Sequence, residues 1–148
     1  MTLRWPDLAL ALLFALLVAA LSWLGVSKAL GAHPWWAAQS GLIGAALGFG
    51  VFLVARLFGT SNTMLALVAA FTLLFAMIAA YFGKSAFVNA EDFNATAGRI
   101  WYFGWISIWS AVTLLLSAVT ARRLKGLCHD CNHPPRRLHR TRDRQTLR

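Results

Sequence analysis

The residues with the clearest capacity for chemistry stand together near the C-terminus. Residues 128–133 read Cys-His-Asp-Cys-Asn-His, and a further histidine follows six residues later. Thiolates and imidazoles are the ligands that tetrahedral zinc prefers. A haem attachment motif is excluded, because that motif needs His directly after the second Cys and Asn132 stands there. The candidate metal ligands are Cys128, Cys131, His133 and His139.

Other interpretations of this cluster stay open. Structural zinc sites usually join two separated ligand pairs, whereas this chain has a single CxxC, and His129 and Asp130 compete as ligands. The nearby positive charge would make the thiols nucleophilic, which suits a redox role or an enzyme built on a thiol or metal centre. A lone CxxC in a basic tail is a weak signal, and an incidental cluster in a flexible tail accounts for the six residues without either role. Zinc is therefore a hypothesis for this segment rather than a consequence of its spacing.

The elements that would position this cluster are predicted to cross a membrane. The chain has 148 residues, 59% of them hydrophobic, and long stretches of it lack any charge, which is typical of a polytopic membrane protein. A helix needs about 20 mostly apolar residues to cross a hydrocarbon core of about 30 Å. Four stretches are long enough: residues 8–27, 35–55, 62–82 and 100–121.

These stretches predict an all-α fold, because a spanning segment must satisfy its backbone hydrogen bonds internally and the alternation of a barrel strand is missing. We expect an integral membrane bundle of four transmembrane helices in residues 1–121, followed by a basic, largely disordered C-terminal tail in residues 122–148. Aromatic residues with amphipathic rings lie near the predicted membrane interfaces. They are Trp5, Trp35, Trp36, Tyr81, Trp101 and Tyr102.

The first span has a second interpretation, as a secretory signal peptide. Arg4 precedes its apolar run, and Ala29-Leu30-Gly31 resembles a cleavage site made of small residues. Against this interpretation, the apolar run is about 19 residues long, whereas the core of a signal peptide usually has about 7 to 15. We therefore expect a retained helix.

Lys and Arg residues close to span ends indicate the orientation. With four spans, both termini and the second connection share one side and hold eleven Lys or Arg residues, whereas the other side holds Lys28, Lys84 and Arg99. We therefore predict a multi-pass protein with both termini in the cytoplasm. The prediction depends on the tail, which supplies nine of the eleven basic residues on that side. The many Arg and Ala residues favour a GC-rich bacterial gene, and so the bacterial cytoplasmic (inner) membrane.

The tail holds nine Lys or Arg residues against Asp130 and Asp143, and it contains few apolar residues. Such a segment cannot bury a core and is predicted to be largely disordered. Anionic lipid head groups attract each nearby basic residue by about 1 kcal/mol, so the bilayer surface is the expected partner of the tail. We expect no specific nucleic acid partner, because the tail lacks aromatic residues for base stacking and a recognisable fold.

Three features of the spans bear on function. None of the predicted spans contains an ionisable residue at depth, which argues against proton-coupled transport. Gly44 and Gly48 form a GxxxG pair, which favours close packing inside the bundle over a dimer interface. Hydroxyl groups share one face of the fourth span, either as helix packing or as the wall of a polar cavity. The hydroxyl face consists of Tyr102, Ser107, Ser110, Thr113, Ser117 and Thr120.

The longest predicted outside connection is residues 83–98, which carries Glu91 and Asp92 and is expected to be a solvated loop or a segment lying on the interface. No pattern in the chain indicates a catalytic site. The sequence therefore predicts a non-enzymatic accessory or structural component of the membrane, which binds a membrane protein partner or a second copy of itself. The alternative is a small oligomeric transporter or channel that uses the polar face of the fourth helix.

Overall fold

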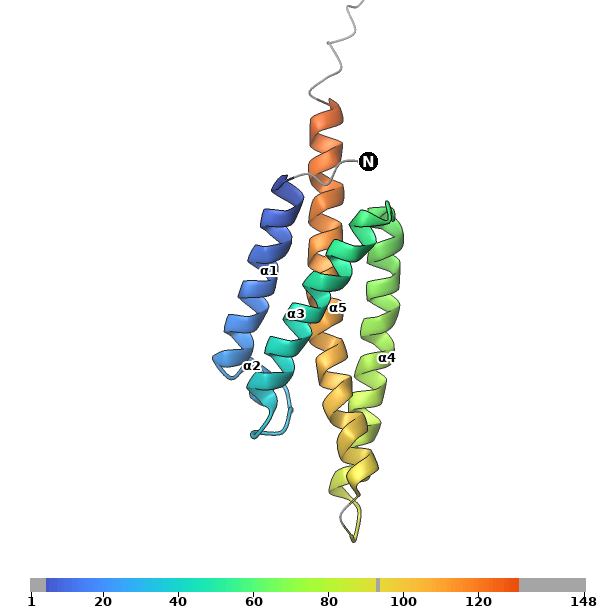
Figure 1. Ribbon diagram of the computed structural model, residues 1–148. Helices are drawn as coiled ribbons and strands as arrows, with labels where there is room; N and C mark the ends of the chain where they lie inside the picture. Colours follow the sequence, from blue (N-terminus) through green and yellow to red (C-terminus); the bar gives the residue numbers. More distant parts are fainter. Residues whose placement is uncertain (1–4, 93, 131–148) are drawn as a thin grey trace, which may run out of the picture.

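The protein is a bundle of long helices, which a computed structural model describes over residues 5–92 and 94–130, with side chains to residue 124. The long helices are α1 (Trp5–Trp23), α3 (Ala37–Leu57), α4 (Asn62–Val88) and α5 (Ala95–Asp130), and the short α2 (Val26–Ala29) follows α1 (Figure 1). Each long helix contains a stretch that is long and apolar enough to cross a membrane. The predicted all-α bundle of four such helices is confirmed.

Helix α5 is the centre of the bundle. The other three long helices all pack against it, and α1 also packs against α3. Figure 1 shows α1 and α4 on opposite sides of α5, while α3 crosses α5 from the side of α1 to the start of α4. The indole rings of Trp101, Trp105 and Trp109 are buried, being 6–7% exposed, and they fill the space between α5 and its neighbours.

Helices α3 and α5 approach each other closely at the two glycines of the GxxxG pair. A Cβ atom added to Gly44 would lie 2.6 Å from the carbonyl oxygen of Ile106, and one added to Gly48 would lie 2.8 Å from Cβ of Thr113. Real Cβ atoms do not approach neighbours that closely, so the missing side chains set the distance between the helices. The prediction that this pair serves packing inside the bundle is confirmed.

Helices α4 and α5 are fixed in register by the same device. A Cβ on Gly83 would lie 2.6 Å from the backbone nitrogen of Trp101, and a Cβ on Gly104 would lie 2.9 Å from that of Ala80. The two helices are antiparallel. When a residue of α4 and a residue of α5 lie at the same level, their residue numbers therefore sum to about 184.

The first helix is shorter than the predicted span. It ends at Trp23, four residues before the predicted end at 27. Gly25 has φ +91° and Gly31 has φ +104°, a left-handed conformation that glycine adopts without strain, and α2 lies between them. Ser22 and Ser27 are buried, and their hydroxyl groups hydrogen-bond to each other across the turn. Helix α1 supplies buried residues to the bundle, and its retention in the mature protein stays a prediction.

The predicted long connection over residues 83–98 is wrong. Helix α4 continues to Val88 and α5 begins at Ala95, because the glycine contact at Gly83 holds both helices together past the predicted span ends. The ring of Phe87 also contacts that of Trp101, with centroids 5.8 Å apart. The side chain of Asn94 then accepts a hydrogen bond from the backbone nitrogen of Ala97 at 3.0 Å and caps α5.

Helix α5 also extends past the predicted membrane domain. Its backbone remains helical to Asp130, nine residues beyond the predicted domain end at 121, where the sequence predicted the start of a disordered tail. At 1.5 Å per residue this adds about 13 Å, and Figure 1 shows α5 projecting beyond the other helices. Arg122 and Arg123 are exposed on this extension.

Candidate functional site

The predicted metal ligands are not brought together by the described structure. Cys128 belongs to α5 by its backbone, but its side chain lies outside the described part, and Cys131, His133 and His139 lie outside the described residues altogether. Among the residues that are described, no three His, Cys, Asp or Glu side chains are grouped as metal ligands would be. Zinc binding by the tail therefore stays a prediction.

The hydroxyl face of α5 is turned inward at its centre. Thr113 is fully buried and Ser117 is 2% exposed. The Thr113 hydroxyl donates to the carbonyl oxygen of Trp109 at 2.9 Å, and the Ser117 hydroxyl donates to that of Thr113 at 2.7 Å. Both hydroxyl groups are thus satisfied by their own helix, a common arrangement in membrane helices. They serve helix packing and do not line a polar cavity.

A labelling experiment distinguishes this arrangement from a water-filled pathway. In a background in which Cys128 and Cys131 are replaced by serine, we expect Ser117→Cys to react at least about tenfold more slowly with a water-soluble thiol reagent than Ser61→Cys, because buried thiols are shielded and inert. Ser61 is exposed at the start of α4 and serves as the control. Equal labelling rates in intact membranes would contradict the packing role and restore the channel hypothesis.

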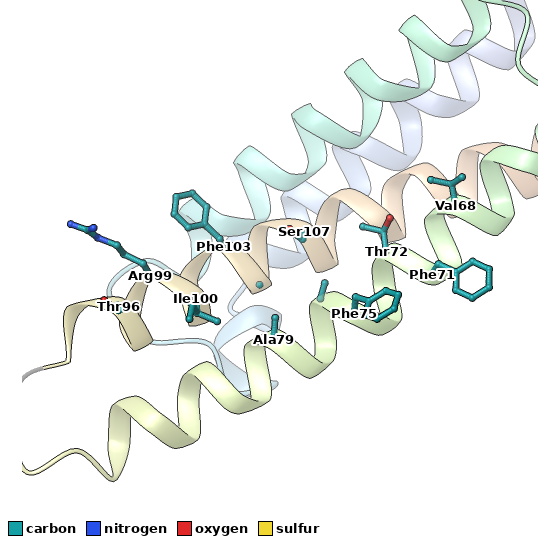
Figure 2. A pocket seen from close by; sticks show the side chains of 12 residues that line it. Val68, Phe71, Thr72, Phe75, Ala79, Thr96, Arg99, Ile100, Phe103 and Ser107 are labelled. Atoms are coloured by element: carbon teal, nitrogen blue, oxygen red, sulfur yellow. The ribbon is translucent and has the colours of Figure 1, made fainter.

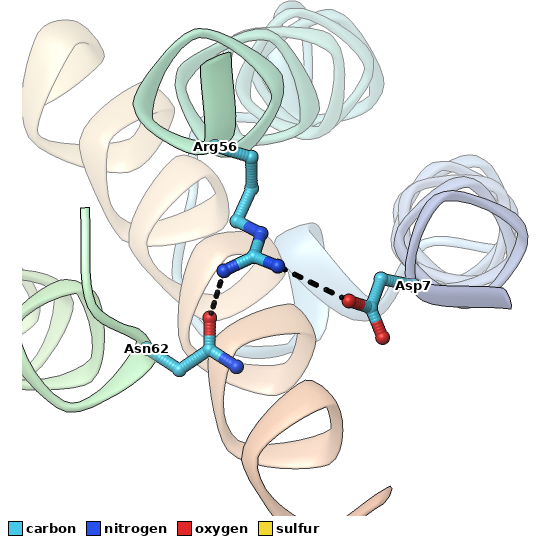
Figure 3. A network of polar contacts seen from close by, with 3 residues as sticks. All are labelled: Asp7, Arg56 and Asn62. Atoms are coloured by element: carbon cyan, nitrogen blue, oxygen red, sulfur yellow. Dashed lines mark hydrogen bonds and ion pairs between the residues drawn. The ribbon is translucent and has the colours of Figure 1, made fainter. Parts of the chain in front are cut away.

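At one end of the bundle, here called the Arg56 end, three helices meet through charged and amide side chains. Nη2 of Arg56 on α3 lies 3.2 Å from Oδ2 of Asp7 on α1, and Nη1 donates to Oδ1 of Asn62 on α4 at 2.9 Å (Figure 3). The side chains of Asp7 and Arg56 are 1% and 10% exposed. The group therefore ties α1, α3 and α4 together, as Figure 3 shows.

The buried pair lies in the first turn of α1 and the last turn of α3, so it does not contradict the expectation that no ionisable residue lies at depth in the spans. The predicted spans began after Asp7 and ended before Arg56, but α1 and α3 include both residues. A buried charge is costly unless it is paired and hydrogen-bonded, which the Asp7 carboxylate provides for the guanidinium. Nε of Arg56 and Nδ2 of Asn62 have no hydrogen-bond partner within the described structure. The pair is best explained as a structural connection between helices.

The opposite end, here called the Trp101 end, carries a hollow of about 870 Å³ lined largely by aromatic rings. The rings of His33 and Trp36 are stacked, with centroids 5.9 Å apart. The ring of Trp101 is nearly perpendicular to both, with its centroid 5.7 Å from that of His33 and 5.3 Å from that of Trp36. We call this space the aromatic hollow. It is lined by His33, Trp35, Trp36, Gln39, Phe87, Ala95, Gly98, Arg99, Trp101 and Tyr102.

The aromatic hollow has the composition of a binding site, with apolar rings and a few polar groups. The polar groups include the side chains of Gln39 and Arg99, which are both exposed, and the half-buried His33. Trp101 is 6% exposed, and its indole nitrogen is a buried donor without a hydrogen-bond partner among the described residues. Sequence reasoning placed Trp36, Trp101 and Tyr102 near an interface but did not identify His33 or Gln39.

Two further hollows adjoin the aromatic hollow. A groove of about 710 Å³ runs between α4 and α5 and shares Arg99 with the aromatic hollow (Figure 2). A smaller hollow of about 430 Å³ shares Trp101 and includes Lys84. Two basic side chains therefore lie beside apolar hollows at this end of the bundle. This arrangement suits ligands that combine an apolar body with a negative group.

Comparison of the chain with protein-family models, with curated proteins and with solved structures gives no match.

Proposed function

We propose that the protein is a small, non-enzymatic accessory component of the bacterial cytoplasmic membrane, which holds a segment of a membrane protein partner in the aromatic hollow. The observation that carries the proposal is the gathering of aromatic rings around Trp101, beside the exposed side chains of Gln39 and Arg99. Aromatic side chains dominate the contacts of many protein interfaces, and the amide of Gln39 and the guanidinium of Arg99 can donate hydrogen bonds to peptide carbonyls of a partner.

The position of the hollow along α5 supports this role. From Trp101 to Ala121 is twenty residues, or about 30 Å of helix, which is the thickness of the hydrocarbon core. Trp101 therefore belongs at one membrane interface and Ala121 at the other. The excess of basic residues after Ala121 favours the cytoplasm for both termini, so the aromatic hollow would open on the opposite side of the membrane.

The alternative function, a small oligomeric transporter or channel, has less support. It was motivated by the hydroxyl face of α5, and the hydroxyl groups of Thr113 and Ser117 are bonded to carbonyls of their own helix. A non-enzymatic role is likewise supported by the residues of the hollow, where the aromatic groups and Arg99 suit binding and positioning.

Photo-crosslinking in cells tests the proposal. A benzophenone amino acid at Gln39, an exposed residue of the aromatic hollow, is expected to give a protein adduct of one defined mass. The same amino acid at Thr63, exposed at the opposite end, should give that adduct at least about fivefold less. Trp35→Ala removes an exposed ring of the hollow and should weaken the adduct, since aromatic contacts dominate many interfaces. Equal adducts at both positions, or lipid adducts alone, would contradict a protein partner at this hollow.

A further inference from the structure

The groove between α4 and α5 combines an apolar lining with one basic side chain at its end. Phe71 and Phe75 of α4 and Phe103 of α5 line it, and all three rings are exposed. Figure 2 shows Arg99 at one end of the groove and Val68 at the other. Among the long helices, α4 has extensive contacts with α5 alone. The groove between them therefore opens directly on the surroundings of the bundle.

The groove begins at the head groups of one leaflet and ends before the opposite membrane interface. By the register of the two helices, Arg99 of α5 lies level with Ser85 of α4. From Ser85 to Val68 the helix rises about 25 Å, which takes the groove past the bilayer centre but leaves it short of the roughly 30 Å hydrocarbon core and the head groups beyond it. The lining ends at Val68, about 9 Å before the start of α4 at Asn62. The groove therefore does not follow the whole span, as the contact face of a partner helix would.

The charge at the end of the groove is placed at the level of lipid head groups. Arg99 lies two residues before Trp101, which belongs at the membrane interface by the length of α5. Its side chain is exposed, and it forms no ion pair with the residues that the structure describes. An arginine in this position can bind a phosphate group through two parallel hydrogen bonds.

We propose that this groove binds one phospholipid with a net negative head group, from the leaflet at the Trp101 end. One acyl chain lies along Phe71, Phe75 and Phe103, and the guanidinium of Arg99 binds the phosphate. The apolar lining holds any phospholipid of that leaflet, and the charge of Arg99 selects the anionic ones. Arg99 also lines the aromatic hollow, but the inference does not require a partner to be bound there.

Site-specific fluorescence quenching tests the proposal on the full-length protein in vesicles. In the background in which Cys128 and Cys131 are replaced by serine, Val68→Cys is labelled with bimane at the deep end of the groove. Vesicles contain phosphatidylcholine and phosphatidylglycerol, and either lipid in turn carries brominated acyl chains that quench bimane on contact. We expect the anionic lipid to bind about fivefold more strongly, the factor that one basic residue near the surface provides.

Two pairs of variants separate charge from shape. Arg99→Gln should reduce the fivefold preference to about one, whereas Lys28→Gln, an exposed cation of α2 that does not line the groove, should leave it unchanged. Ala79→Phe places a ring in the groove and should at least halve quenching by both lipids. Ala70→Phe, an exposed position of α4 outside the groove lining, should leave quenching unchanged.

Three results would overturn the proposal. One is equal binding of the two lipids by the unsubstituted groove, and another is a preference that survives Arg99→Gln. The third is weak quenching by both lipids together with a dimer when the protein in the same vesicles is treated with a chemical crosslinker. A second copy of the chain would then occupy the groove.

Discussion

Gly48→Leu is expected to lower the free energy of unfolding of the bundle by about 3 kcal/mol, the upper part of the range for overpacked cores. Its Cβ atom would collide with Cβ of Thr113 and the backbone oxygen of Ser110. A backbone oxygen cannot rotate away, so α3 and α5 would have to separate. Separation also removes the contacts of Gly44 with Ile106 and Trp109.

Gly50→Leu is the matched control for this experiment. Gly50 lies on the same helix two residues away, and a Cβ atom there would meet nothing within 4 Å. Leucine is a better helix former than glycine by roughly 0.5 to 1 kcal/mol, so this variant should be as stable as the original protein or slightly more stable. Unfolding would be followed by circular dichroism in mixed micelles as the fraction of denaturing detergent rises. Similar losses for both variants would show that the glycines do not set the helix distance.

The membrane bundle was predictable because span length and apolar composition are properties of the sequence alone. The ends of the helices were not, because local backbone conformation and contacts between helices decide them. Gly25 ends the first helix through its left-handed conformation, and the contact between Gly83 and Trp101 extends α4 and α5 beyond the membrane core. A span predicted from hydropathy contains neither kind of information.

The candidate site was predictable only in part. Aromatic residues at the predicted interfaces gave Trp36 and Trp101 their approximate depth, and the structure places their rings 5.3 Å apart. The participation of His33 depends on the turn after α2 and on the register of α3 against α5, which no spacing in the sequence reveals. The hollow therefore had to be found in three dimensions.

A different signal was available for the buried pair at the Arg56 end. Asp7 precedes the first predicted span and Arg56 follows the second, and adjacent antiparallel spans bring those positions to the same end of the bundle. Opposite charges at such positions are candidates for pairing, although they are 49 residues apart. The orientation rule counts Arg56 but not Asp7, so it does not reveal this relation.

Asp7→Ala is expected to reduce the free energy of unfolding by about 3 to 5 kcal/mol, because it leaves the buried guanidinium of Arg56 without its counter-charge. Asp7→Asn keeps an oxygen near Nη2 and should cost less. Lys28→Leu removes an exposed cation that forms no ion pair within the described residues, and should change stability by less than about 0.5 kcal/mol. The measurement is again detergent-induced unfolding of each variant in mixed micelles.

The double variant Asp7→Leu/Arg56→Met decides whether the pair itself carries this stability. Apolar residues at both positions leave no buried charge, so its loss should be at least about 2 kcal/mol smaller than the sum of the two single losses. Asn62 would still lose the hydrogen bond that Arg56 now donates, so recovery should be incomplete. Additive losses would mean that Arg56 reaches the head groups without Asp7, and that α1 is held in the bundle by its apolar contacts alone. A large coupling would mean instead that one ion pair fixes the start of α1 against the end of α3.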